Sequence, residues 1–182
     1  MRILLILVFF TSFAYAQEVT FDAIEEIKGL CYLKGTNQLF TGKTVDFYSN
    51  GKKSIEVEYQ NGVESGTNRT WYNTGILMNE TQIDSGKING YWIDYFPNGT
   101  KQNEIVYEDD YMNGPCTRWY ENGNIKETGN YKHCRETGEW KYYWENGNFK
   151  AIGTYEDAIK QGKWKYFDEK GNQIEKEINQ AE

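Results

Sequence analysis

The chain has 182 residues, with 20 Lys plus Arg against 27 Asp plus Glu and a formal net charge of −7. An acidic chain argues against a nucleic-acid partner, because phosphate binding needs Lys and Arg. One histidine and three cysteines leave little material for a metal site or for histidine-based catalysis, so we expect no metal and no cofactor. The aromatic content of 16% indicates an ordered chain rather than a disordered one.

The first 16 residues have the pattern of a secretory signal peptide. Arg2 precedes an apolar run over residues 3–10, and Ala14 and Ala16 are the small residues that a signal peptidase reads. A transmembrane anchor is the alternative, but the run is shorter than the roughly 18–20 residues that span a bilayer. We therefore predict Sec-type export to the periplasm, the cell surface or the medium, with no transmembrane segment after signal cleavage.

Residues 17–41 form an N-terminal segment that lacks the regular pattern of the rest. Residues 18–28 carry apolar side chains at near-helical spacing, which predicts a short helix or a loop. Residues 30–34 and 39–40 flank a turn-forming stretch, so we predict a degenerate capping hairpin there.

From residue 42 onward, glycines recur every 24 residues without insertion or deletion. The first glycine of each repeat is Gly42, Gly66, Gly90, Gly114, Gly138 or Gly162, and a second series is Gly51, Gly75, Gly99, Gly123, Gly147 and Gly171. The place of a residue is given below as its offset from the first glycine of its repeat. A fixed period is the signature of a repeat array, so we predict six repeats over residues 42–178 and a frayed tail over residues 179–182.

Each repeat has the pattern of a β-hairpin, as residues 138–155 illustrate. Aromatic residues alternate from Trp140 to Trp144 at strand spacing, and a second strand follows Asn146-Gly147. Asn-Gly predicts a type I′ turn. A two-residue loop pairs offset 2 with offset 15 and offset 6 with offset 11, which places Phe149 on the face of the tryptophans and Lys150 on the opposite face.

A second bend closes each repeat, and Asn61-Gly62, Asn89-Gly90 and Asn113-Gly114 fall in or near it. The chain then reverses twice in each repeat, and neighbouring hairpins share one sheet. We therefore predict an all-β fold: an elongated antiparallel meander of about six 24-residue β-hairpin repeats in a single twisted sheet.

The repeat units GYWIDYFPNG, GEWKYYWENG and GKWKYFDEKG resemble the bacterial MORN-repeat variant. The resemblance covers residues 30–178. Related cytoplasmic proteins carry the label YwqK-type antitoxin, which implies binding and neutralisation of a toxin, and eukaryotic MORN proteins are linked to scaffolding and membrane attachment. The predicted signal peptide departs from a cytoplasmic role.

The aromatic column at offset 5 is the candidate binding site. Its members, called the aromatic row below, are Phe47, Trp71, Tyr95, Trp119, Tyr143 and Phe167. Equivalent strands of the meander lie roughly 9–10 Å apart, so these side chains form a line on one face. Such a line is suited to a protein partner or to stacking sugar rings, and the alternative is that it stabilises the sheet by cross-strand pairing.

Two functional classes follow from these patterns. The favoured one is an exported, non-enzymatic repeat protein that presents an extended β surface to a protein partner, as a scaffold or a toxin-neutralising protein. The alternative is a glycan or cell-wall binding module that uses the aromatic row. Cys116 and Cys134 are the nearer pair for one disulfide, and unpaired thiols are the other interpretation.

Overall fold

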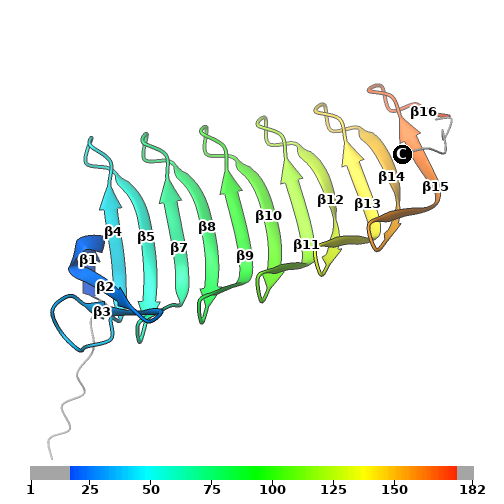
Figure 1. Cartoon of the computed structure of the whole chain (residues 1–182). Coiled ribbons are helices and arrows are strands. Elements are labelled where there is room, and N and C mark those ends of the chain that lie inside the picture. The colour runs from blue at the N-terminus through cyan, green and yellow to red at the C-terminus, as the bar shows by residue number, and fades with distance from the viewer. Residues whose placement is uncertain (1–16, 176–182) are drawn as a thin grey trace, which may run out of the picture.

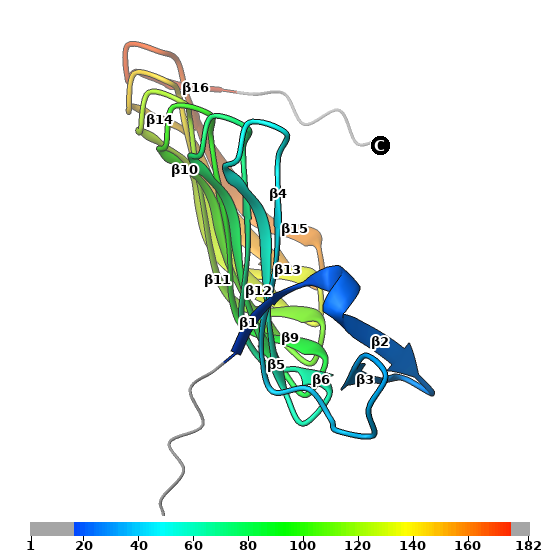
Figure 2. The same ribbon diagram turned by 90° about the vertical axis from the view of Figure 1, so that its left-hand side faces the viewer.

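The computed structural model describes residues 17–175, and the predicted signal peptide and the frayed tail lie outside them. The described residues form one sheet of 14 strands and a separate two-stranded sheet. Strands that are neighbours in sequence pair antiparallel along almost the whole large sheet, which confirms the predicted all-β meander. Figure 1 shows the hairpins side by side in one elongated array, and Figure 2 shows the same sheet nearly end-on.

The elements follow the chain in the order of their labels. The N-terminal elements are β1 (Gln17–Thr20), the 3-10 helix η1 (Phe21–Ala23), β2 (Ile24–Ile27) and β3 (Leu30–Leu33). The repeats contain β4 (Gly42–Phe47), β5 (Lys53–Gln60), β6 (Val63–Glu64), β7 (Gly66–Trp71), β8 (Leu77–Asp84), β9 (Lys87–Tyr95), β10 (Lys101–Glu108), β11 (Tyr111–Trp119), β12 (Ile125–Lys132), β13 (Arg135–Tyr143), β14 (Phe149–Glu156), β15 (Ile159–Phe167) and β16 (Gln173–Ile174). None of the helices within residues 17–175 is long and apolar enough to cross a membrane.

The hairpin turns differ from the predicted type I′ geometry. In the fifth repeat the Gly147 N–H donates to the Trp144 carbonyl at 2.9 Å, and the Trp144 N–H donates to the Asn148 carbonyl at 2.8 Å. Gly147 has a φ of 89°, whereas Asn146 is not among the residues with positive φ. These features define a longer loop that ends in a glycine bulge. The Asn146 side chain favours it by accepting from the Asn148 N–H at 3.0 Å.

The bulge changes which residues share a face. Trp140 pairs with Gly153 as predicted, but Tyr143 pairs with Phe149, because the register shifts between Tyr142 and Tyr143. Offset 5 rather than offset 6 therefore lies opposite offset 11. The predicted faces of Phe149 and Lys150 were wrong: Phe149 stacks on Tyr143 at 5.0 Å, and Lys150 Nζ lies 4.5 Å from the Trp144 ring.

The bends at the opposite end of the strands are the two-residue turns with positive φ at both positions. Asn61-Gly62 was predicted correctly, but the bends of later repeats lie at Asp109-Asp110 and His133-Cys134, whereas Asn89-Gly90 and Asn113-Gly114 lie inside β9 and β11. A left-handed backbone conformation, with positive φ, is unfavourable for residues other than glycine. Each bend is tied to the preceding repeat, as where the Cys134 N–H donates to the Met112 carbonyl at 2.9 Å.

The N-terminal segment covers one end of the array. Leu30–Leu33 pairs with Ile24–Ile27 on one side. On the other side it meets residues 38–40 across the predicted turn, through the antiparallel bridge Tyr32–Leu39 and a hydrogen bond from the Phe40 N–H to the Cys31 carbonyl at 2.9 Å. In place of the short helix or loop predicted for residues 18–28, the structure has the three residues of η1 between two strands. Phe40, Val57 and Tyr59 are buried beneath this segment. β1 pairs parallel with β4, so it closes the outer edge of the first repeat.

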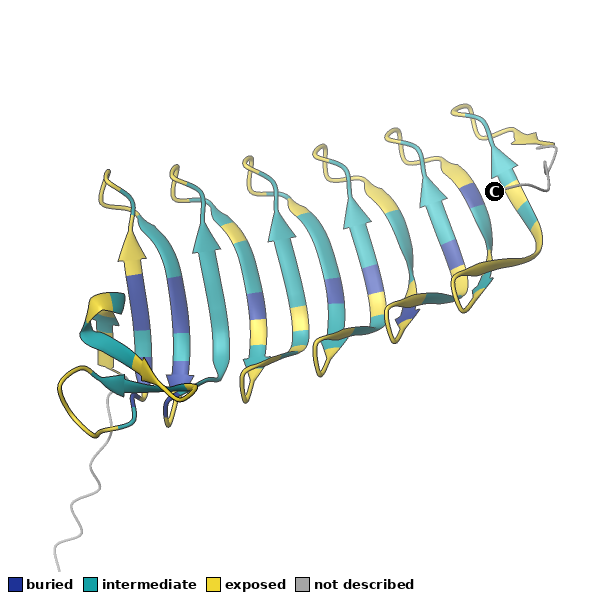
Figure 3. Ribbon diagram, in the orientation of Figure 1, coloured by how far each residue is buried: buried dark blue, intermediate teal, exposed yellow. Residues whose placement is uncertain are grey.

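The main core is a cluster of aromatic side chains on one face of the single sheet, called the cluster face below. Trp140 is 1% exposed and packs edge-on against Tyr131 at 5.2 Å and Tyr155 at 6.0 Å. Its ring lies directly over Gly129, where a Cβ atom would be 2.2 Å from two indole carbons. Figure 3 shows short buried segments in many but not all strands of the array, with none in β7, β9 or β15. Burial comes from neighbouring side chains within one layer.

Side chains at the turns connect each repeat to the next. Offset 6 donates to the carbonyl of offset 5 in the following repeat, and an asparagine at offset 8 donates to the carbonyl of offset 7 there. These bonds are Tyr48–Trp71 (2.6 Å), Tyr72–Tyr95 (2.7 Å), Tyr120–Tyr143 (2.8 Å) and Trp144–Phe167 (3.0 Å), with Asn50–Asn73, Asn98–Glu121, Asn122–Glu145 and Asn146–Glu169 beside them. They explain why these columns recur in the sequence. Phe96 is at offset 6 of the third repeat and has no hydroxyl.

Phe96→Tyr is expected to raise the free energy of unfolding by about 0.5–1.5 kcal/mol, the usual net contribution of one hydrogen bond. The new hydroxyl would occupy the position from which Tyr120 donates to the next repeat. Urea denaturation followed by tryptophan fluorescence measures the change. The matched control is Tyr120→Phe, which should lower stability by a similar amount, and no change in either variant would contradict the role of this bond.

Candidate interaction surface

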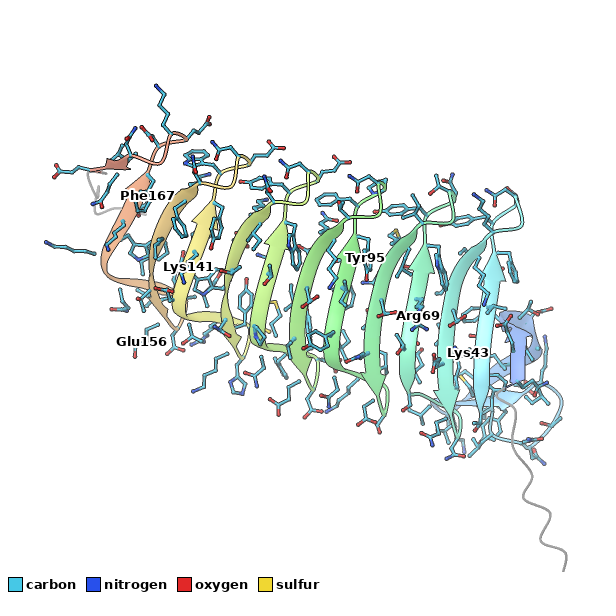
Figure 4. The ribbon with its side chains drawn as sticks, turned by 180° about the vertical axis from the view of Figure 1, so that it is seen from behind. Lys43, Arg69, Tyr95, Lys141, Glu156 and Phe167 are labelled. Carbon is cyan, nitrogen blue, oxygen red and sulfur yellow. The ribbon has the colours of Figure 1, made fainter. Side chains whose placement is uncertain are left out.

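The aromatic row lies on the face opposite to the Trp140 cluster, called the row face below. Its six members are the last residues of β4, β7, β9, β11, β13 and β15. Phe47 is 45% exposed and the others are half-buried. In Figure 4, which shows this face, Tyr95 and Phe167 lie near the turn end of their strands and no segment crosses the strands of the repeats. The described chain therefore leaves this face open to a partner.

Part of the row also stabilises the sheet. Tyr143 stacks on Phe149, and Phe149 lies 6.1 Å from Phe167, so the last two repeats share a continuous line of rings. Lys101 Nζ lies 5.9 Å from the ring of Trp119 in the middle of the array. Cross-strand pairing and an accessible surface thus coexist along one column.

The middle of the row face carries mostly uncharged side chains on β9, β10 and β11, and the charged group between them is Glu104, which pairs with Ile93 and with Thr117 across the sheet. This neutral patch, which sequence inspection missed, consists of Tyr91, Ile93, Val106, Pro115 and Thr117, and Tyr91 is 45% exposed. Tyr91 pairs with Val106 across β9 and β10. The patch is formed by residues of two neighbouring repeats that lie side by side across the sheet. The sequence of one repeat therefore does not reveal it.

A network of ion pairs borders the neutral patch toward the N-terminus. Glu56 is only 7% exposed and binds Lys43 at 3.1 Å, Lys53 at 2.8 Å and Arg69 at 3.3 Å. Arg69 Nε also binds Glu80 at 2.7 Å. Figure 4 shows Lys43 and Arg69 on this face. A centre of mostly uncharged side chains with a polar rim is the usual composition of a protein interface.

The charge of Glu56 is favoured by this network. Burial alone would raise the pKa of Glu56, but the hydrogen bonds and charges of Lys53 and Lys43 outweigh it and hold the pKa below its usual 4.5. A carboxyl group whose pKa is lowered by folding stabilises the native state above its unfolded pKa. That contribution disappears as the pH falls through the folded pKa.

Glu56→Gln is expected to lower the free energy of unfolding at pH 7 by about 1.5–3 kcal/mol, because it removes charged hydrogen bonds in a buried place. The difference from the unchanged protein should shrink as the pH is lowered below 4.5. Glu104→Gln is the matched control, since Glu104 has the same offset but pairs with Lys101 in a more exposed place. A pH-independent difference would contradict the ionic origin of the effect.

The acidic residues of the cluster face do not form a catalytic pair. Asp94 accepts hydrogen bonds from Trp92 at 2.9 Å, Asn79 at 2.8 Å and Asn103 at 3.0 Å. Asp46 is exposed and accepts from the Phe47 N–H. Between residues 17 and 175, no three His, Cys, Asp or Glu side chains gather closely enough to hold a metal ion.

A hollow of about 250 Å³ is lined by residues of β5, β7, β8 and β9, from Val57 to Trp92, and sequence inspection did not find it. Ile55, Val57 and Ile83 are among its lining residues. It opens because Asn68 stands at offset 2, where the third, fifth and sixth repeats have tryptophan. Smaller side chains thus interrupt the aromatic covering of the sheet at this point.

The cysteines considered for a disulfide are free in the structure. Cys116 is buried and aligned with Gly129 of β12, while Cys134 is exposed in the bend beyond that strand. Five further residues of extended chain correspond to about 16 Å, much more than the roughly 7 Å that a disulfide spans. Burial raises the pKa of the Cys116 thiol to about 11, which favours the unreactive protonated form.

These features define the protein as a tandem β-hairpin repeat protein with a continuous sheet and side-chain connections from each repeat to the next. The family model of the MORN repeat variant matches residues 40–61, 88–109, 112–133 and 136–157. The chain belongs to the MORN-repeat family, as the sequence resemblance indicated, and each matched segment starts two residues before the first glycine of a repeat. A comparison with curated proteins gave no match.

Proposed function

We propose that the chain is an exported, non-enzymatic binding protein that holds another protein against its row face. MORN repeats indicate a repeat protein with a binding role and are generally not enzymes. The observation that carries the proposal is the neutral patch beside Tyr95 and Trp119, on a face that no described element covers. Tyrosine and tryptophan are the residues on which protein interfaces most depend.

The rigidity of the array supports this role. Each repeat is connected to the next by hydrogen bonds at the turns and at the bends. A preformed surface loses little conformational entropy when a partner binds. The partner fits one of two roles: a toxin that is neutralised, or an envelope protein for which this chain is a scaffold. Export rests on the signal-peptide pattern of residues 1–16.

The test is retention of envelope proteins on the immobilised full chain, with the bound species identified by mass spectrometry. The combined variant Tyr91→Ala, Trp119→Ala should lose the retained protein. Tyr111→Ala is the matched control, because Tyr111 is 56% exposed but lies beside the bend, away from the neutral patch. Retention by this control with loss in the patch variant supports the proposal.

A glycan competitor separates the alternative function from the proposed one. If soluble cell-wall fragments elute the bound material, and isolated polysaccharide is retained through Trp119, the row is a glycan-binding surface and the protein-binding proposal fails. A partner that resists such fragments and loses its toxicity in the presence of this chain identifies the toxin-neutralising role. A partner without toxicity identifies the scaffold role.

A further inference from the structure

The C-terminal edge of the large sheet is open over most of its length. β15 pairs on one side with β14 along the whole strand, but on its other side β16 pairs only with Tyr166 and Phe167. Within the described residues, no strand lies beside Ile159–Lys165 on that side. Ile159 is 65% exposed, more than any other large apolar side chain between residues 17 and 175. A row of unpaired backbone groups is a template for one more strand.

The opposite edge of the sheet differs. There β1 pairs parallel with β4 over four residues, from Gln17 with Gly42 to Thr20 with Val45. The N-terminal segment also covers the neighbouring side chains, including Val57 and Tyr59. Figure 1 shows this segment at one end of the array and the open strand β15 at the other. The open edge at the N-terminal end is therefore only the four residues of β1, whereas at the C-terminal end it is the longer stretch Ile159–Lys165 of β15.

Lysines on β15 indicate the charge of a strand that would fit. Lys163 and Lys165 are exposed, lie at offsets 1 and 3, and have no ion-pair partner among residues 17–175. Cations at the same offsets in earlier repeats bind carboxylates of the strand that follows: Lys43 binds Glu58 at 3.0 Å, and Arg69 binds Glu80 at 2.7 Å. The missing strand should therefore carry acidic side chains opposite Lys163 and Lys165.

The cluster face sets the alternate positions of that strand. Trp164 points toward the cluster face, contacting Tyr155 at 4.9 Å and Tyr142 at 6.0 Å on its inner side. Side chains of an added strand that point to the same face would pack against its outer side, so they should be apolar. Since side chains alternate between faces along a strand, the fitting sequence alternates apolar and acidic residues.

The molecule contains a template for such a strand. In β5 the residues Ile55, Val57 and Tyr59 point to the cluster face, while Glu56 and Glu58 point to the row face and bind Lys43. We propose that the open edge of β15 binds an extended segment of a partner protein in which apolar and acidic residues alternate as in β5. The segment adds to the sheet antiparallel to β15. This site lies at the C-terminal edge of the sheet, away from the neutral patch on β9, β10 and β11, and does not depend on the proposed function.

The probe is a fluorescent synthetic peptide with the sequence of residues 54–60, SIEVEYQ, titrated into the full chain at low salt. We expect saturable binding, with slowed hydrogen exchange of the backbone amides over residues 159–165. The combined variant Lys163→Glu, Lys165→Glu should bind at least about tenfold more weakly, because two attractive cross-strand pairs become repulsive. Lys141→Glu is the matched control, since Lys141 is at offset 3 of an interior strand, and it should bind as the unchanged chain does.

A charge exchange makes the test specific. A second peptide with lysine in place of Glu56 and Glu58 should bind the doubly substituted chain and not the unchanged one. The proposal is wrong if both peptides bind the unchanged chain equally, or if protection appears elsewhere than residues 159–165. It is also wrong if the peptide binds only a chain that ends at Glu175, since residues 176–182 would then be the occupant of the edge.

Discussion

Trp140→Ala is expected to lower the free energy of unfolding by about 3–5 kcal/mol, the range for truncating a fully buried large aromatic residue. Trp140 is 1% exposed and contacts Tyr131, Tyr142 and Tyr155. A single-layer sheet has no second layer that could collapse into the space left by the ring. Removing this ring should therefore expose its neighbours and weaken two adjacent repeats together.

Chemical denaturation of two further variants identifies the origin of this loss of stability. Trp119→Ala removes a half-buried ring of the aromatic row and should cost roughly half as much or less. Trp140→Phe should cost less than Trp140→Ala, because the Trp140 Nε1–H is buried without a hydrogen-bond partner and phenylalanine removes that penalty. Equal losses for Trp140→Ala and Trp119→Ala would contradict the placement of the core on the cluster face.

Gly129→Val should destabilise the protein by about 3 kcal/mol, at the upper end for overpacking of a core. A Cβ atom at this position would lie 2.2 Å from two carbons of the Trp140 ring. Gly129 is not among the glycines with positive φ, so the effect is steric rather than conformational. The measurement is again the unfolding midpoint, together with the tryptophan fluorescence of the folded state.

Gly123→Ala provides the matched control for the backbone. Gly123 has a φ of 87° and no heavy atom within 4 Å of an added Cβ, so its replacement should cost about 1 kcal/mol from backbone strain alone. In the double variant Gly129→Val, Trp140→Leu, the smaller leucine leaves room for the valine side chain. This double variant should therefore recover part of the stability that Gly129→Val loses. Additive effects of the two substitutions would show that Gly129 and Trp140 do not interact.

The sequence predicted the repeat, the meander and the pairing of offset 2 with offset 15, because these follow from a period that is visible in glycine and aromatic positions. It misassigned Phe149 and Lys150 because the faces depend on one bulged residue, and Asn-Gly is compatible with two loop geometries. Asn89-Gly90 and Asn113-Gly114 lie inside strands, because hydrogen bonds between neighbouring repeats, rather than an Asn-Gly pair, support the positive φ of bends such as Asp109-Asp110.

The N-terminal cap and the open surfaces were harder to predict for a different reason. The pairing of β1 with β4 joins residues more than 20 positions apart through a four-residue strand with little pattern of its own. The aromatic row is visible in the sequence, whereas the neutral patch requires residues of three strands to be placed side by side. The pairing of the two strands within one repeat was thus accessible from the sequence, whereas the bulge beside its turn and the surfaces formed between repeats required the structure.

The connections at the turns also determine how such a protein can change its length. The tyrosines and Trp144 at offset 6 and the asparagines at offset 8 donate to the next repeat, until Asp168 replaces the aromatic residue and accepts from the N–H groups of Lys170 and Asn172 in its own loop. Asp168 therefore ends the series without leaving a donor unpaired. Duplication or deletion of 24 residues before it preserves every connection, and each such event moves the two ends by roughly 9–10 Å. The length of the array can therefore change during evolution in equal steps of one repeat, and so be matched to the size of a partner.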